Sequence, residues 1–230
     1  MLDADYQTVD ARPARERDMV SWSPDTIAGL PPIAWNVPNP ELIAQFLDVL
    51  QQARDEKPLQ TFFEHHPVAL LTGLVKPHRA WVIPKPKLPT PNGGGWVPDF
   101  IICEWPTVGP DWIIVELESP TKKPINKDGE VSAICNHAVE QINDYKTYLR
   151  DHAHFLRGDG WPKLHGECSG VVVIGRRGDR RRLAHAERLD AFKRQRIDIV
   201  SYDRLVDSCS TVMQGAASSW LGAAAQSNRT

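Results

Sequence analysis

The sequence has few cysteines, and no two of them lie close together along the chain. The four are Cys103, Cys135, Cys168 and Cys209, so no CxxC pair and no zinc-ribbon pattern is present. Their wide scatter also excludes a framework of closely spaced disulfides. This cysteine usage is typical of a reducing compartment, and we expect a cytoplasmic protein.

Long apolar runs are absent as well. No stretch approaches the roughly 20 residues that a helix needs to cross a bilayer. The first residues, MLDADYQTVD, contain no apolar segment of the kind found in signal peptides. We therefore expect a protein without a membrane partner.

The chain also lacks a strong excess of charge of either sign. A formal net charge of −2 excludes a protein that is basic over its whole surface. Any contact with nucleic acid must therefore come from a local patch. With 230 residues and 41% hydrophobic content, the chain can form one substantial core, or a core with an appendage.

Two apolar segments around a turn carry the most informative acids. Residues 97–102 (VPDFII) and 112–118 (WIIVELE) are rich in β-branched residues, which favours buried strands. The segment PTVGPD between them supplies turn residues, so the two strands are expected to form a hairpin. Pairing about this turn places Asp99 within one residue of facing Glu116 or Glu118. The two glutamates share one face because side chains alternate along a strand.

Three carboxylates on one face of an apolar sheet repel one another, and burying them without compensation costs several kcal/mol each. A divalent cation with oxygen ligands is the natural compensation. In the alternative arrangement the acids lie at strand ends, pair with lysines and face water. The Pro-Asp pair and the Glu-x-Glu pattern within apolar strands favour a metal site at Asp99, Glu116 and Glu118.

Apolar residues at helical and strand spacing predict the remaining elements. We expect helices from Asn39, from Pro58 to His66 and from Ser132 to Arg150, strands near 81–84, 170–175 and 197–202, a helix over 183–192, a short helix at 203–206 and a partly helical tail. The expected organisation is an N-terminal arm and helix (1–56), a main domain (57–207) and a C-terminal tail (208–230).

Five arginines directly follow the apolar strand predicted at 170–175. They are Arg176, Arg177, Arg180, Arg181 and Arg182. Such a run is usually a solvated face, but its position at the end of a buried strand also suits phosphate binding. The sequence leaves both interpretations open.

The order of these elements, with Pro98-Asp99 and Glu116-Leu117-Glu118 on the middle strands, resembles the PD-(D/E)xK nuclease core. At family level the chain resembles the Shedu anti-phage nuclease domain. The segments that carry this resemblance are LQTFFEHHP (59–67), VPDF (97–100), VELESP (115–120), His137-Ala138 with Gln141, VIGR (173–176) and IDIVSYDRL (197–205). The resemblance implies an α/β (α+β) fold, in which helices flank a central mixed sheet.

The same resemblance implies a function. It implies a DNA endonuclease that would require Mg²⁺ or Mn²⁺, defend a prokaryotic cell against phage and act as a homo-oligomer. Carried over by position, Asp99 and Glu116 would bind the cation, and Gln141 would support the site from the helix. Glu64 matches the acid on the helix that precedes the core, although its spacing alone indicates a solvated residue.

Position 118 departs from the superfamily pattern, because this chain has Glu where Lys is usual. Two options follow: a variant site in which Lys122 or Lys123 supplies the missing positive charge, or a site with impaired chemistry. In an active site, Glu118 would position the attacking water or take its proton. Two alternatives to a nuclease stay open. One is a DNA-end or DNA-structure binding module that does not cut, and the other is a purely structural partner domain.

Overall fold

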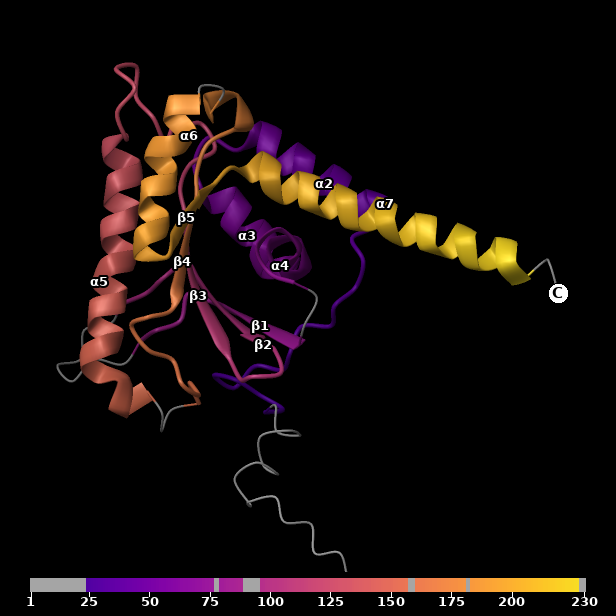
Figure 1. Cartoon of the computed structure of the whole chain (residues 1–230), viewed down its shortest axis with the longest axis horizontal. Helices are drawn as coiled ribbons and strands as arrows, with labels where there is room; N and C mark the ends of the chain where they lie inside the picture. The colour runs from indigo at the N-terminus through magenta and orange to yellow at the C-terminus, as the bar shows by residue number, and fades with distance from the viewer. Residues whose placement is uncertain (1–23, 77–78, 89–95, 157–159, 181–182, 228–230) are drawn as a thin grey trace, which may run out of the picture.

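The computed structural model describes residues 24–76, 79–88, 96–156, 160–180 and 183–227 (Figure 1). Its elements, in chain order, are α2 (Pro40–Gln52), α3 (Lys57–His65), α4 (Pro67–Leu74), β1 (Arg79–Pro84), β2 (Phe100–Trp105), β3 (Asp111–Leu117), α5 (Ala133–Leu156), β4 (Ser169–Val173), η1 (Arg177–Arg180), α6 (Leu183–Asp190), η2 (Ala191–Gln195), β5 (Ile197–Val200) and α7 (Tyr202–Ser227).

A mixed five-stranded sheet in the order β1-β2-β3-β4-β5 forms the centre of the molecule. The first three strands are antiparallel neighbours, whereas β3, β4 and β5 run parallel. Helices α5 and α6 lie on one side of the sheet, and α2, α3, α4 and α7 lie on the other (Figure 1). This arrangement confirms the predicted α/β class, in which helices flank a central mixed sheet.

Each face of the sheet has its own hydrophobic core, because strand side chains alternate. The face toward α5 buries Ile101, Ile114 and Val172 against Ile142 and Leu149. The opposite face buries Phe100, Val115 and Val173 against Phe63 of α3 and Leu205 of α7.

Helix α2 begins as the sequence predicts and joins the second core. The Asn39 side chain accepts a hydrogen bond from the Leu42 N–H at 2.8 Å, and Pro40 occupies the first turn. Phe46 and Leu50 are buried with α3, α4 and α7. The segment before residue 57 therefore shares its core with the main domain, and the division of the chain at that residue stays a prediction.

The hairpin has the expected turn but a later start. Strand β2 begins at Phe100 rather than Val97, because Pro98 has no N–H to donate to a neighbouring strand. The register pairs Phe100 with Val115, so continuing it by one residue places Asp99 opposite Glu116. The sequence predicts that Asp99 lies within one residue of facing Glu116 or Glu118, and this placement agrees with that expectation.

The C-terminal segment differs most from expectation. Instead of a short helix and a separate tail, a single helix α7 runs over Tyr202–Ser227 and extends well beyond the body of the molecule (Figure 1). Helix α4 was not predicted. Among the described residues, no helix is both long and apolar enough to cross a membrane.

Candidate active site

Asp99 and Glu116 meet where β2 begins and β3 ends. The Asp99 side chain is tied to β3, because its Oδ2 accepts a hydrogen bond from the Leu117 N–H at 2.9 Å. Its backbone carbonyl accepts from the Lys85 N–H at 2.9 Å. Glu116 is almost fully buried, with 7% of its surface exposed. By strand alternation Asp99, Glu116 and Glu118 all belong to the face that α5 covers.

Glu118 follows directly after β3 and is held by its backbone on two sides. Its N–H donates to the Val173 carbonyl on β4, and its carbonyl accepts from the Tyr202 hydroxyl at the start of α7, both at 2.8 Å. The loop that follows is anchored as well, since the Ser119 hydroxyl donates to the Arg54 carbonyl at 2.8 Å. This anchor joins the end of β3 to the turn between α2 and α3.

Burial and repulsion from nearby acids raise the pKa of Asp99, Glu116 and Glu118. Burial, with the Asp99 charge second, raises the pKa of Glu116 to about 8, although a hydrogen bond from Tyr145 opposes the shift. Burial and the charges of Glu56 and Asp99 raise the pKa of Glu118 to about 7. Burial also raises the pKa of Asp99, against the Leu117 N–H and Lys85. Groups that titrate near neutral pH in this way are typical of functional sites.

Helix α5 contributes three side chains on this side of the sheet. The Tyr145 hydroxyl hydrogen-bonds to Glu116, and the Tyr145 ring packs edge-on against Trp96 at 5.5 Å between centroids. His137 is exposed but near enough to lower the pKa of Glu118. Gln141, predicted to support the site, lies half-buried one helical turn from His137. Tyr145 was predicted only as a core residue, and its role as a partner of Glu116 depends on a contact between distant elements.

Helix α3 brings two further acids toward Asp99. Glu56 and Glu64 both raise the pKa of Asp99, and Glu56 also raises that of Glu118. Glu64, predicted as the helix acid of the site, is exposed and accepts a hydrogen bond from Gln60 at 3.3 Å. Glu56 was missed, because it precedes α3 in an unremarkable polar turn. Hydrogen bonds from the Ser119 and Thr121 hydroxyls to the Arg54 carbonyl bring that turn to the end of β3.

The donor atoms suit a divalent cation, although the acids are not drawn together around one point. Within the described ranges, no three His, Cys, Asp or Glu side chains are arranged to hold an ion. Oε1 of Glu116 is nevertheless buried without a hydrogen-bond partner. A buried carboxylate oxygen of this kind is satisfied either by a proton or by a cation, and carboxylates are the ligands that Mg²⁺ and Mn²⁺ prefer. The donor chemistry of these residues therefore suits such an ion, and their arrangement would have to tighten around it.

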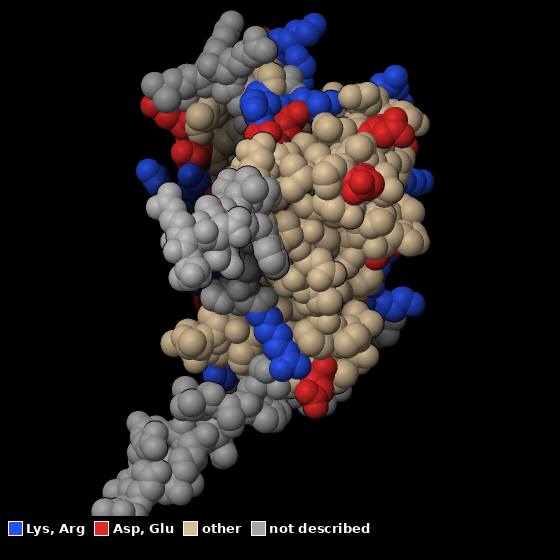
Figure 2. Space-filling model, turned by 90° about the vertical axis from the view of Figure 1, so that its right-hand side faces the viewer, with Lys and Arg blue, Asp and Glu red and all other residues tan. Residues whose placement is uncertain are grey.

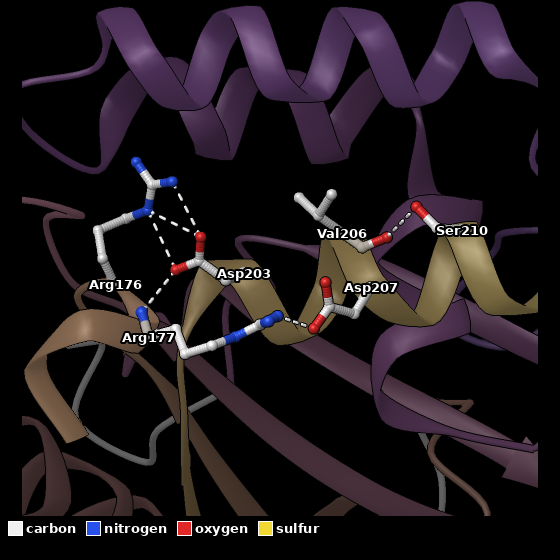
Figure 3. Close-up of polar contacts among 6 residues, drawn as sticks. All are labelled: Arg176, Arg177, Asp203, Val206, Asp207 and Ser210. Carbon is white, nitrogen blue, oxygen red and sulfur yellow. Dashed lines mark hydrogen bonds and ion pairs between the residues drawn. The ribbon is translucent and has the colours of Figure 1, made fainter. Parts of the chain in front are cut away.

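Two of the five predicted DNA-binding arginines form ion pairs with α7 (Figure 3). Arg176 makes a double contact with Asp203, from Nη2 to Oδ1 at 2.9 Å and from Nε to Oδ2 at 3.1 Å. Arg177 donates its backbone N–H to Asp203 at 2.6 Å, and its side chain pairs with Asp207. These two arginines join the end of β4 to the start of α7. Arg181 and Arg182 lie outside the described residues.

Replacing Asp203 by asparagine should destabilise the fold by about 1–2 kcal/mol, since it removes charge-assisted hydrogen bonds at a partly exposed position. Burial acts to raise the pKa of Asp203, but Arg176 and the Arg177 N–H outweigh it and hold the pKa below its ordinary value. The carboxylate therefore stabilises the fold at neutral pH. This contribution starts to fall near pH 4, the ordinary aspartate range, and disappears as the pH drops through the lowered pKa.

Urea unfolding of the parent and the variant at pH 7 and pH 3 measures this difference. Asp190→Asn is the matched control, because Asp190 pairs with Lys193 at the surface and should contribute little. An equal loss for both variants, or a loss for Asp203→Asn that is as large at pH 3 as at pH 7, would contradict the assignment.

Comparison with known proteins places the chain in a family. The restriction endonuclease FokI bound to DNA is a similar solved structure, at 15% identity and a TM-score of 0.44 over 74% of this chain. The chain spans 27% of that protein's length. No curated protein matches the sequence. Residues 53–206, which hold the acids, the sheet and the start of α7, match the family described as Shedu protein SduA, C-terminal. The chain belongs to this Shedu family.

Proposed function

We propose that the chain is a metal-dependent DNA endonuclease that hydrolyses phosphodiester bonds in defence against phage. The observation that carries the proposal is the group of acids on the α5 face of the sheet, where the Leu117 N–H holds Asp99 beside Glu116. The buried, unpartnered Oε1 of Glu116 supports a cation at this group. Membership of the Shedu family supports the defence role.

Asp99, Glu116 and Glu118 would hold Mg²⁺ or Mn²⁺. When bound, such an ion polarises a scissile phosphate and lowers the pKa of a coordinated water. The protein supplies the proton acceptor: Glu118 would position the attacking water or take its proton. Tyr145 orients Glu116 through its hydroxyl, and Gln141 lies on the same helix.

The positive charge that the superfamily places at position 118 must come from elsewhere in this chain. Lys122 is exposed in the loop after β3, where its charge lowers the pKa of Glu118, and its N–H donates to the Ser119 carbonyl at 3.1 Å. We assign Lys122 to the reacting phosphate and Lys123 to the neighbouring DNA backbone. By sequence position alone, we extend the DNA-binding assignment to Arg180, Arg181 and Arg182, which follow β4 in the chain. Arg176 and Arg177 pair with α7 and so also join the end of β4 to that helix.

A homo-oligomer is supported by the surface that α2 and α7 share. Residues 208–227 contain no Asp, Glu, Lys or Arg, although they belong to a helix that leaves the body. Leu47 and Val212 on these helices are each 37% exposed. Figure 2 shows this side of the molecule as a broad area with few charged side chains. Such an area favours contact with a second copy.

The test is incubation of the purified protein with supercoiled and linear DNA, with Mg²⁺, with Mn²⁺ and with EDTA. Nicking or linearisation only in the presence of metal supports the nuclease, and light scattering on the same preparation gives the number of copies. No cleavage with either ion, at protein concentrations where DNA is bound, would contradict the proposed nuclease activity.

That last result would favour the second candidate, a DNA-end or DNA-structure binding module. The observation in its favour is Glu118 itself, since a glutamate stands where the superfamily's lysine orients water. Salt-sensitive DNA binding without cleavage would identify it. A protein that neither binds nor cuts DNA would instead be a structural partner.

A further inference from the structure

A cavity of about 400 Å³ lies at the end of the sheet opposite the acids. It is bounded by the C-terminal half of α5, the loop before β4 and the junction between η2 and β5. Its size is within the range of roughly 300–1,000 Å³ that small-molecule sites have. In the β3–β4 register, Ser169 at the start of β4 pairs with Ile113. Glu118 lies five residues further along the chain, a distance of about 16 Å along a strand.

The walls of this cavity carry an excess of positive charge. Lys146, Arg150, Arg194 and Arg196 line it, together with one acid, Glu167. Arg150 and Glu167 approach to 3.7 Å with both side chains largely exposed. Four cations against one anion leave three positive charges around one cavity. The Cys168 thiol adds no negative charge, because burial raises its pKa to about 11.

Lys146 is the buried member of the set. Only 6% of its surface is exposed, and its Nζ donates to the backbone carbonyls of Gln195 at 2.8 Å and Arg196 at 3.4 Å. An ammonium group has three N–H donors, so one remains for a ligand. Burial lowers the pKa of Lys146, and an anion in the cavity would offset this cost.

Both backbone walls are fixed in position. A Cβ on Gly166 would lie 2.4 Å from the Lys146 carbonyl oxygen and 2.9 Å from the Arg150 Cβ, so the loop approaches α5 closely only with glycine there. Arg196 has a left-handed backbone with φ of 56°, and its carbonyl accepts from the Gly170 N–H at 2.8 Å.

We propose that this cavity binds a phosphate group, supplied either by a nucleic-acid backbone or by a free nucleotide. Guanidinium groups bind phosphate oxygens in a two-pronged fashion, and a lysine adds a point charge. The cavity offers two arginines on one wall and an arginine with a buried lysine on the other. The site is separate from the acids, and its existence does not depend on the proposed nuclease activity.

The experiment is calorimetric titration of the full chain with pyrophosphate, ATP and a short DNA duplex. The test variant is Arg194→Gln with Arg196→Asn, because asparagine tolerates the left-handed backbone while removing the charge. We expect pyrophosphate to bind the parent and to bind the variant at least roughly tenfold more weakly, the scale of one or two lost charge-assisted hydrogen bonds.

The matched control is Lys76→Gln with Lys127→Gln, which removes the same charge from exposed positions away from the cavity. Equal melting temperatures establish that all variants are folded. If the duplex competes with pyrophosphate in the parent but not in the variant, the phosphate is that of DNA; if ATP alone competes, it is that of a free nucleotide. Absence of pyrophosphate binding to the parent, or an equal effect of test and control variants, overturns the proposal.

Discussion

Replacing Glu116 by glutamine is expected to abolish DNA cleavage and, at the same time, to make the protein more stable. The carboxylate is buried, one of its oxygens has no hydrogen-bond partner, and the Asp99 charge lies beside it. Glutamine keeps the shape and can still accept a hydrogen bond from Tyr145, but it loses the negative charge that would bind a cation. Cleavage should fall by about 10²-fold or more, the scale for removing a group that stabilises charge in the transition state.

The gain in stability follows from the raised pKa of Glu116, about 8 in the folded protein against an ordinary value near 4.3. The folded protein holds this proton more tightly than the unfolded chain. The parent therefore loses stability as the pH rises from about 4 through about 8, whereas glutamine does not titrate. We expect the variant to be more stable by about 1–3 kcal/mol at pH 8.5 without metal, and the difference to shrink toward pH 5.

Urea unfolding in EDTA at these two pH values, alongside a nicking assay, measures both effects. Asp99→Asn should lose cleavage too, but it also weakens the hydrogen bond from the Leu117 N–H and so should not share the full gain in stability. Asp111→Asn, at the exposed far end of β3, is the control and should cut and unfold like the parent. Full cleavage by the Glu116 variant would remove this residue from the site.

The placement of the acids could be predicted because it depends on local rules. Alternation places Glu116 and Glu118 on one face, and a short turn fixes how β2 pairs with β3. The start of β2 was predicted too early, since apolar composition alone extends a strand through Pro98. A proline cannot donate to the ladder, so the chain pairs only from Phe100 onward.

The features that sequence reasoning missed all depend on contacts between distant segments. Glu56 reaches the site through an anchor between residues 65 positions apart, Ser119 and Arg54. Arg176 belongs to an arginine-rich run of the kind that binds DNA, yet it pairs with Asp203, which follows 27 positions later. No period or local composition encodes either contact. The cavity around Lys146 is of the same kind, because three separate segments bring its cations together.

Glu118 is the position where this chain departs from the PD-(D/E)xK pattern that its sequence resembles, and changing it should separate cation binding from phosphate chemistry. Glu118 adds a third carboxylate beside Asp99 and Glu116, so removing it in Glu118→Ala should lower both metal affinity and cleavage. A lysine there would place a fixed positive charge at the same point. Glu118→Lys is therefore expected to bind metal more weakly still, while keeping some nicking because lysine can serve the superfamily's role.

The pH dependence of metal binding distinguishes a ligand from a neighbour. Glu118 titrates at about 7 in the metal-free protein, and only its ionised form can bind a cation. Lowering the pH from 8 to 6 protonates it, so the parent's metal affinity should fall by up to about tenfold per pH unit for each proton released on binding. Glu118→Ala removes one of these protons and should show a shallower dependence.

The decisive measurement is calorimetric titration of Mg²⁺ and Mn²⁺ into the parent, Glu118→Ala and Glu118→Lys at pH 6, 7 and 8, alongside nicking of supercoiled DNA. If Glu118→Ala binds metal with the parent's pH dependence and cuts at the parent's rate, Glu118 is a bystander, and Asp99 and Glu116 must hold the cation with side chains from α3 and α5.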